Sequence, residues 1–174
     1  MTISRKITMV GDFSVGKTSL IRRYVEGKFD DRYLSTVGVK ISRRSLEVAA
    51  PDGGDPQAMQ LIVWDLEGQT KFKAIAPSYL QGSKGTIIVA DLSRPETIEN
   101  IEGHIALYRS VSKDGAISVA LNKADLVEAG RSQMLLGEVR DRHKDEILHA
   151  YTTSAKSGAN VESLFLELAA ATLA

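Results

Sequence analysis

The sequence predicts an α/β protein built on a doubly wound, mostly parallel sheet. Short apolar runs recur along the chain and are almost uninterrupted, which is the pattern of strands covered on both faces. These runs occupy residues 7–10, 61–64, 86–90 and 116–121. Stretches with helical periodicity alternate with the runs, and this alternation places helices on both faces of a parallel sheet. A glycine-rich loop directly follows the first run, where a sheet of this kind binds phosphate groups.

The helical stretches are recognised by apolar residues that repeat every three or four positions. One begins at Lys17, and a second follows Pro95. Two more are predicted at residues 132–142 and 160–172. Asn160 should be the N-cap of the last, because asparagine accepts hydrogen bonds from the first turn of a helix. About five helices are expected in all.

Residues 41–64 lack helical periodicity and predict a hairpin instead. Two strand-like runs, residues 41–50 and 58–64, flank a linker rich in glycine, proline and aspartate, and such linkers favour a reversal of the chain. A further strand is predicted at residues 147–151. The expected sheet is therefore six-stranded and mixed, mostly parallel with one antiparallel edge strand.

Composition limits both the size and the chemistry of the protein. A chain of 174 residues most simply forms one domain, so we expect a single domain over residues 1–174. Lysine plus arginine and aspartate plus glutamate number 22 each, and this balance disfavours binding to nucleic acid through overall charge. The absence of cysteine excludes disulfides, thiolate metal sites and thiol-linked lipid anchors. Because no run is long enough to span a membrane, we expect a cytoplasmic protein without an intrinsic membrane anchor.

The loop after the first strand carries the pattern Gly-x4-Gly-Lys-Thr at residues 11–18. Gly11 and Gly16 allow a tight turn in which backbone N–H groups converge on an anion, and the N-terminus of the following helix adds partial positive charge. Lys17 supplies a cation for the outer phosphates, and the Thr18 hydroxyl is an oxygen ligand of the kind that Mg²⁺ prefers. The alternative is a loop that only joins a strand to a helix, but the complete pattern favours a phosphate site.

Two segments at the ends of later strands predict recognition of guanine. They are Asn122-Lys123-Ala124-Asp125 and Thr153-Ser154-Ala155-Lys156. Asp125 can accept hydrogen bonds from the ring N–H and the amino group of guanine, whereas adenine has no matching donors. The stem of Lys123 can lie along the base, and Asn122 can bond to the purine and to the neighbouring loop. The second segment can direct a backbone N–H at the guanine oxygen, although either segment alone could be a helix cap or a surface turn.

A third segment provides groups for phosphoryl transfer. Asp65 can hold Mg²⁺ through a water molecule, Gly68 can bring its N–H to the terminal phosphate, and Gln69 can orient an attacking water. Thr36, in the loop before the hairpin, is a second candidate Mg²⁺ ligand that would also sense the terminal phosphate.

Together these motifs resemble those of the small GTPases of the Ras superfamily, most closely the Rab branch, and the sequence looks like an atypical or prokaryotic member. The resemblance covers essentially the whole chain and rests on five motifs in the family's order. They are residues 11–18, Ser35-Thr36-Val37-Gly38-Val39, Trp64-Asp65 with Gly68-Gln69, Asn122-Lys123-Ala124-Asp125 and Ser154-Ala155-Lys156. The implied fold is the P-loop NTPase G domain, which agrees with the α/β class predicted above.

The resemblance implies a GTP-binding molecular switch that hydrolyses GTP to GDP and phosphate with Mg²⁺. It assigns catalytic roles to Gln69, Lys17 and Thr36, and metal ligation to Thr18, Thr36 and Asp65. Contacts to the nucleotide are implied for a larger set of residues from all the motifs. This set is Gly11, Asp12, Ser14, Val15, Gly16, Lys17, Thr18, Ser19, Phe29, Tyr33, Thr36, Gly68, Asn122, Lys123, Asp125, Ser154, Ala155 and Lys156.

The same resemblance implies two segments that GTP orders and hydrolysis releases. Thr36 and its neighbours would form switch I, and residues 68 to about 79 would form switch II. Phe29 looks like the aromatic residue that packs edgewise on guanine, and Tyr33 like the residue that closes over the phosphates. Effectors, an exchange factor and a GTPase-activating protein would bind through the switches. Hydrolysis by the isolated protein is expected to be slow, because no arginine of the chain is clearly placed to stabilise the charge of the transition state. A peripheral position at a membrane, reached through a partner, is also expected.

Three features depart from the family pattern. Phe13 occupies a loop position that is usually glycine, serine or another small residue, and Glu67 stands where alanine normally precedes Gly68. The C-terminal cysteines and basic tail of Rab proteins do not occur. The Phe13 ring either crowds the attacking water or folds outward as a lid. The Glu67 carboxylate either faces the cation site, near Lys17 and Mg²⁺, or points to solvent.

Two functions stay open on the sequence alone. Gln69 favours a switch that hydrolyses GTP. The alternative is a nucleotide-dependent binding module with little or no hydrolysis, in which Phe13 and Glu67 disturb the water site. The histidines have no metal-ligand spacing and are expected to be solvated or cap-like; they are His104, His143 and His149.

Overall fold

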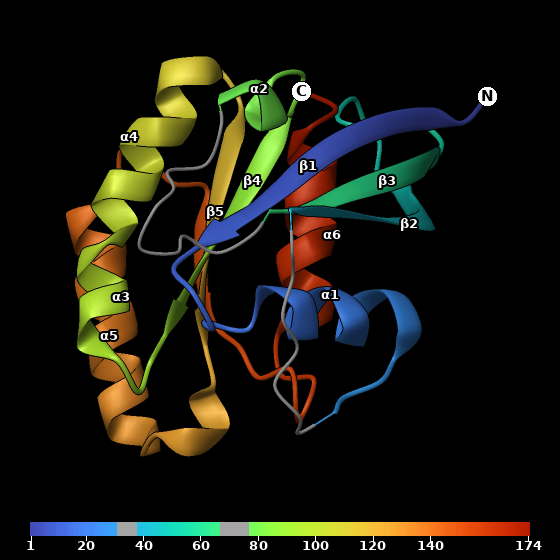
Figure 1. The fold of residues 1–174 in the computed structure, drawn as a ribbon. Helices are drawn as coiled ribbons and strands as arrows, with labels where there is room; N and C mark the ends of the chain where they lie inside the picture. The colour runs from blue at the N-terminus through green and yellow to red at the C-terminus, as the bar shows by residue number, and fades with distance from the viewer. Residues whose placement is uncertain (31–37, 67–76) are drawn as a thin grey trace.

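The structure is a computed structural model of the chain, and it describes residues 1–30, 38–66 and 77–174. Its strands are β1 (Ile3–Gly11), β2 (Val39–Val48), β3 (Gln57–Leu66), β4 (Gly85–Asp91), β5 (Ala116–Asn122) and β6 (His149–Thr152). They form one sheet in the order β2-β3-β1-β4-β5-β6 (Figure 1). β2 pairs with β3 in antiparallel fashion, and every other pairing is parallel. The predicted six-stranded mixed sheet with one antiparallel edge strand is confirmed.

Helices cover both faces of this sheet (Figure 1). They are α1 (Lys17–Glu26), α2 (Pro77–Leu80), α3 (Pro95–Glu99), α4 (Ile101–Val111), α5 (Ala129–Arg142) and α6 (Val161–Ala171), with a 3₁₀ turn at Ala124–Leu126. α1 and α6 contribute to one hydrophobic cluster against the strands, and α4 and α5 contribute to a second. Within the described ranges, no helix is both long enough and apolar enough to cross a membrane.

The helix predicted after Pro95 is in fact two helices, because the chain turns at Asn100. The Asn100 side chain is exposed, and its Nδ2 donates to Asp12 Oδ2 at 2.7 Å. α4 keeps the predicted apolar stripe, which is buried at Ile101 and Tyr108. The break therefore preserves the packing and adds a contact to the loop that follows β1.

Asn160 is the N-cap residue of α6, as predicted, but its side chain makes no capping hydrogen bond. Its backbone is left-handed with φ at 60°, a conformation that asparagine tolerates better than most residues. Its Nδ2 instead donates to the carbonyl oxygen of Thr152 at 2.7 Å. The side chain therefore joins the start of α6 to the end of β6.

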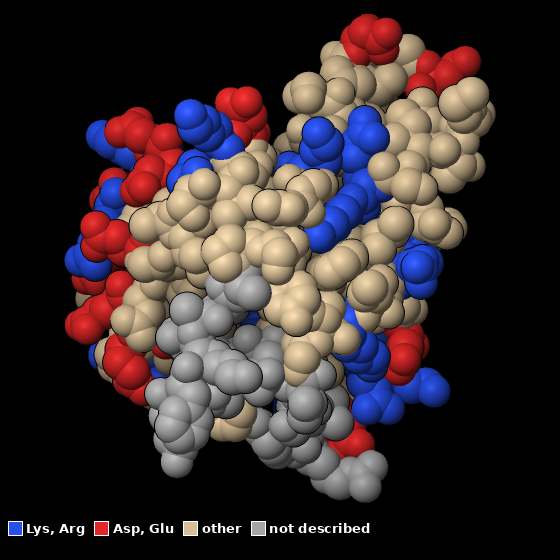
Figure 2. Space-filling view, turned by 45° about the horizontal axis from the view of Figure 1, so that its top comes forward, with Lys and Arg blue, Asp and Glu red and all other residues tan. Residues whose placement is uncertain are grey.

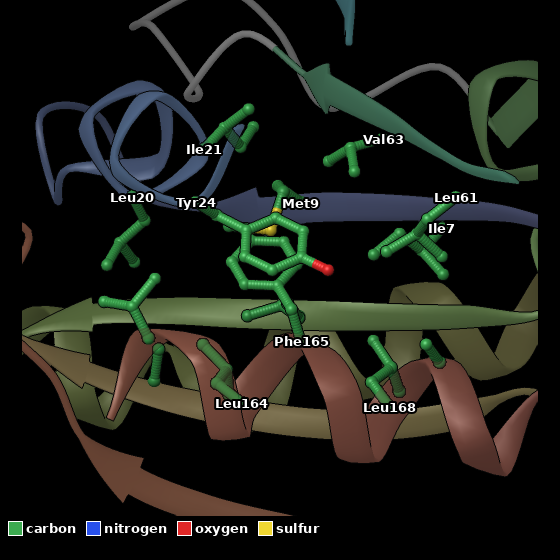
Figure 3. Close-up of a cluster of buried hydrophobic side chains, with 14 of the residues drawn as sticks. Ile7, Met9, Leu20, Ile21, Tyr24, Leu61, Val63, Leu164, Phe165 and Leu168 are labelled. Atoms are coloured by element: carbon green, nitrogen blue, oxygen red, sulfur yellow. The ribbon is translucent and has the colours of Figure 1, made fainter. Parts of the chain in front are cut away.

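An aromatic stack fixes α1 inside the fold. Figure 3 shows Tyr24 of α1 and Phe165 of α6 face to face, and their ring centroids are 4.0 Å apart with the planes inclined by 3°. The Arg44 guanidinium of β2 lies 4.0 Å from the Tyr24 ring centroid and also donates to the Tyr24 carbonyl oxygen at 2.6 Å. Aromatic and cation–π contacts stabilise beyond the apolar area that they bury. α1, which begins at the glycine-rich loop, is therefore held between β2 and α6.

Charge is distributed evenly over the helical side of the molecule. In Figure 2, acidic and basic side chains alternate along the side that α3, α4 and α5 form. This alternation reflects the balance of 22 basic and 22 acidic residues in the chain. A face with both signs interspersed creates no strong field of one sign.

Gly115, in the turn before β5, tests the packing under α4. A Cβ at this position would lie 2.1 Å from Tyr108 Oη and 2.6 Å from Ser112 Oγ. Because Tyr108 is fully buried, we expect Gly115→Ala to lower the free energy of unfolding by about 1–3 kcal/mol, measured by urea denaturation. Gly137→Ala is the control, since nothing lies within 4 Å of a Cβ there and alanine favours a helix. Equal stability of the two variants would contradict the packing argument.

Candidate functional site

The segments predicted to form the site lie at one edge of the sheet, where the parallel strands end (Figure 1). β1 leads into the loop of residues 11–18, β3 ends next to Asp65, β5 ends at Asn122, and β6 leads into residues 153–156. Neighbouring parallel strands bring their carboxyl ends together, and such an edge is where α/β sheets bind ligands. The contacts between these segments show that they meet.

Two glycines of the loop lie too close to neighbouring strands for any side chain. A Cβ at Gly16 would lie 2.3 Å from Asn122 Nδ2, and one at Gly11 would lie 2.4 Å from the carbonyl oxygen of Val89. Gly16 also has a φ of 101°, which residues with a side chain rarely adopt. The loop is therefore drawn tightly against β4 and β5, leaving its backbone as the surface that a ligand would meet.

Lys17 begins α1 and folds back over the loop. Its Nζ donates to the carbonyl oxygens of Gly11 at 3.1 Å and Asp12 at 3.0 Å. Burial lowers the pKa of Lys17 to about 8, although the carboxylates of Asp65 and Asp12 act against this shift and Arg94 adds to it. A lowered pKa means that the surroundings do not fully compensate the buried ammonium. Such a cation is suited to an anionic ligand.

Asn122 and Lys123 hold two further carbonyl oxygens of the loop. Asn122 Nδ2 donates to Val15 at 3.0 Å, and Lys123 Nζ donates to Ser14 at 3.0 Å. Asn122 is itself oriented, because Thr153 Oγ1 donates to its Oδ1 at 3.1 Å. The segment predicted to recognise the base is thus physically joined to the segment predicted to hold the phosphates.

The two segments predicted to bind a base also contact each other. Ser154 Oγ donates to Asp125 Oδ1 at 2.7 Å, and a backbone hydrogen bond of 3.0 Å joins the segments as well. Arg23 of α1 donates through Nε to the carbonyl oxygen of Ala155 at 2.7 Å and binds the carbonyl oxygen of Lys156. Asp125 is therefore an oriented acceptor beside a loop that is anchored to α1.

Thr18 and Asp65, two of the predicted metal ligands, are neighbours. Thr18 Oγ1 donates to Asp65 Oδ2 at 2.5 Å, and Asp65 is buried. A hydroxyl and a carboxylate are oxygen ligands of the kind that Mg²⁺ takes, usually together with water and phosphate. The residues present at this position therefore fit a magnesium ion.

Sequence reasoning missed Asp91 and Arg94. Asp91 ends β4 and is buried, and its Oδ2 accepts from Arg94 Nε at 3.1 Å and from Lys123 Nζ at 3.0 Å. Burial raises the pKa of Asp91, but hydrogen bonds from Ser93, Lys123 and Arg94 outweigh it and hold that pKa below its usual value. Arg94 Nη2 also donates to the carbonyl oxygen of Phe13 at 2.7 Å. For Asp91 the signal was available, because it is a polar residue at the end of an apolar run, as at the ends of β3 and β5.

The Asp12 side chain is held by the junction of α3 and α4. His104 Nε2 lies 2.9 Å from Asp12 Oδ1, beside the contact that Asn100 makes. The expectation that the histidines are solvated or cap-like is wrong for His104, which lies within α4 and is only 8% exposed. His143 is buried as well, but it is the C-cap residue of α5, so the cap-like alternative is confirmed for it. Each is buried beside a carboxylate, and for His143 the partner is Glu146, whose Oε1 lies 3.1 Å from Nδ1.

Several predicted site residues fall outside the described ranges and stay predictions. They are Tyr33, Thr36, Gly68 and Gln69, and the open question about Glu67 also falls there. Phe29 is described, and it packs partly buried against the hydrophobic cluster of α1 and α6. Ser19 lies in the first turn of α1.

Comparison with known proteins identifies the family. The family model described as "Ras family" matches residues 6–174. The chain belongs to the Ras family. This Ras-family protein is 34% identical over 166 residues to the Ras-related protein Rab-13 of Mesocricetus auratus, a match that covers 94% of this chain and 77% of the relative.

Two further relatives come from a plant and a yeast. The Ras-related protein RABD1 of Arabidopsis thaliana is 32% identical over 166 residues, and the match covers 94% of this chain and 77% of the relative. The GTP-binding protein ypt5 of Schizosaccharomyces pombe is 31% identical over 170 residues, and the match covers 97% of this chain and 78% of the relative. This Ras-family protein is thus a GTP-binding small GTPase of the Rab branch, which confirms the resemblance carried by the five motifs.

Proposed function

We propose that this Ras-family protein is a switch that binds Mg²⁺·GTP at the site described above, hydrolyses it to GDP and phosphate, and thereby changes the conformation of switches I and II. One observation carries the proposal: the three successive loop carbonyl oxygens of residues 13–15 each accept a hydrogen bond from a side chain at or just after the end of β4 or β5. The C=O and N–H of a trans peptide point in opposite directions. The held carbonyls therefore turn the loop N–H groups to the other side, where they can receive phosphates.

The base and the phosphates would be bound by different parts of this site. Asp125 would accept the ring N–H and amino group of guanine, and the Ala155 N–H would donate to the guanine oxygen. Phe29 would pack on the edge of the base. Lys17 would neutralise charge on the outer phosphates, and Tyr33 would close over them.

Magnesium would be held by Thr18 and Thr36, with Asp65 acting through a water molecule. When bound, this ion neutralises charge that develops on the phosphate oxygens during transfer. Gln69 would orient the attacking water, and the Gly68 N–H would contact the terminal phosphate. The Phe13 side chain is 46% exposed, which favours the outward position of its ring over crowding of that water.

Residues 1–174 would act as a single GTP-binding domain. Hydrolysis would be slow until an activating protein completes the site, because intrinsic rates of such switches are low. Effectors and an exchange factor would bind the switch segments. The protein would be cytoplasmic and would associate peripherally with a membrane through a partner.

The nucleotide content and the hydrolysis rate test this function. Protein purified without added nucleotide should release GDP or GTP on denaturation, identified by chromatography. Under single turnover with Mg²⁺, the wild-type protein should release phosphate slowly. Gln69→Leu should release it at about a tenth of the wild-type rate or below, because the attacking water is no longer oriented.

Each result has a clear meaning for the proposal. Release of an adenine nucleotide would contradict the assignment of the base site. Phosphate release that is undetectable in the wild-type protein, with GTP bound, would favour the binding module over the hydrolysing switch. Equal rates for wild type and Gln69→Leu would remove Gln69 from the reaction.

A further inference from the structure

We propose that Arg94 is a positioning residue of the phosphate loop: it sets the direction of the Phe13–Ser14 peptide, and through this peptide the affinity for the second phosphate of a guanine nucleotide. The inference deepens the proposed function and rests on it. Arg94 directly precedes α3 as its N-cap residue and belongs to none of the motifs by which the family was recognised.

Arg94 is held in place while it contacts the loop. Its Nε pairs with the buried Asp91 Oδ2 at 3.1 Å, and its Nη2 donates to the Phe13 carbonyl oxygen at 2.7 Å. A guanidinium carries its N–H donors in one rigid plane, so the ion pair with Asp91 also fixes the direction of Nη2. The contact is therefore a preorganised clamp on one loop carbonyl.

This carbonyl belongs to the peptide that ends in the Ser14 N–H. Because the C=O points toward Arg94, the N–H of the same planar trans peptide points away from Arg94, toward the side where phosphate would lie. Ser14 has a φ of 63°, a left-handed conformation that costs a residue with a side chain about 1–2 kcal/mol. A peptide rotation would relieve that strain, and the Arg94 contact opposes the rotation.

The Asp91 carboxylate also orients the side chain that holds the next peptide of the loop. Asp91 Oδ2 also pairs with Lys123 Nζ at 3.0 Å, and Lys123 Nζ donates to the Ser14 carbonyl oxygen at 3.0 Å. One buried carboxylate thus orients two cations that hold two successive loop carbonyls. Lys123 belongs to the base-binding segment, whereas Arg94 does not, so removal of Arg94 leaves the side chains of that segment in place.

A purely structural role for Arg94 makes a different prediction. If Arg94 only neutralised Asp91 or stabilised the start of α3, its loss would weaken every nucleotide by a similar factor. If it orients the loop, its loss should weaken nucleotides that carry a second phosphate and spare those that do not. The GDP and GMP affinities of one protein preparation separate the two roles, because their ratio does not depend on the folded fraction.

The experiment measures GDP and GMP affinities, with saturating Mg²⁺, for wild type, Arg94→Ala and Arg142→Ala. Arg142 is an exposed arginine at the end of α5 and serves as the matched control. Arg94→Ala should lower the affinity for GDP by about tenfold or more, which is the usual effect of losing a hydrogen bond from a charged donor. Its affinity for GMP should fall by less than about threefold. Arg142→Ala should match the wild type with both ligands.

Two results would overturn the inference while leaving the proposed function intact: equal weakening of GDP and GMP in Arg94→Ala, or no weakening of either. A wild-type protein that binds neither ligand would instead overturn the proposed function, and the inference with it. A lower GDP-to-GMP affinity ratio that appears only in Arg94→Ala supports the inference.

Discussion

Lys17→Ala should lower the affinity for Mg²⁺·GTP by about a hundredfold or more, because charge-assisted hydrogen bonds to phosphate are among the strongest that a side chain can make. The Lys17 ammonium is buried, and within the described ranges its hydrogen bonds go to the carbonyl oxygens of Gly11 and Asp12, which carry no net charge. A phosphate would supply the missing negative charge. Isothermal titration of nucleotide-free protein with GTP measures the loss.

The matched control is Lys113→Ala, which removes an exposed lysine before β5 and should leave GTP affinity unchanged. Lys17→Ala should change the stability of the nucleotide-free protein much less than it changes affinity. Burial of the ammonium is itself unfavourable, as the lowered pKa of Lys17 indicates. Removing this buried charge therefore offsets the free energy lost with its two hydrogen bonds. Retained GTP affinity in Lys17→Ala would contradict the phosphate site, and unfolding of the variant would show that Lys17 serves the fold instead.

The convergence of Lys17, Asn122 and Asp125 at one edge of the sheet could be predicted from the sequence. Each follows a short apolar run, and the carboxyl ends of parallel strands meet at one edge whatever the intervening loops do. The hairpin of β2 and β3 was predictable for a similar reason, because its linker lacks any helical pattern. In both cases a local signal and a general rule of sheet topology give the same answer.

Arg94 and His104 could not be assigned in this way. An arginine before a proline and a histidine on a helix are common surface features, and nothing in their spacing shows which way the side chains point. Their direction depends on how the break at Asn100 sets α3 and α4 against the loop, and that is a property of tertiary packing. The capping hydrogen bond that Asn160 does not make has the same origin: the asparagine side chain donates to the end of β6 instead of accepting from its own helix.

Asp125→Asn should reverse the base preference, lowering GTP affinity and raising affinity for xanthosine triphosphate. The carboxylate accepts from the ring N–H and the amino group of guanine, and an amide offers one acceptor and one donor instead. Xanthine carries an oxygen where guanine has its amino group, so the new donor meets an acceptor. Sites that read a base by buried hydrogen bonds discriminate strongly, and we expect the ratio of the two affinities to change by about a thousandfold.

The structure indicates that this substitution should leave the loop in place. Ser154 Oγ donates to Asp125 Oδ1 at 2.7 Å, and a hydroxyl can donate equally to the amide oxygen of asparagine. The anchor from Arg23 to the Ala155 carbonyl does not involve Asp125. Competition of both triphosphates against one fluorescent nucleotide gives the ratio, with Asp145→Asn, an exposed aspartate before β6, as the matched control. An unchanged ratio in Asp125→Asn would show that Asp125 does not read the base, because the loop geometry offers no other reason for the preference to persist.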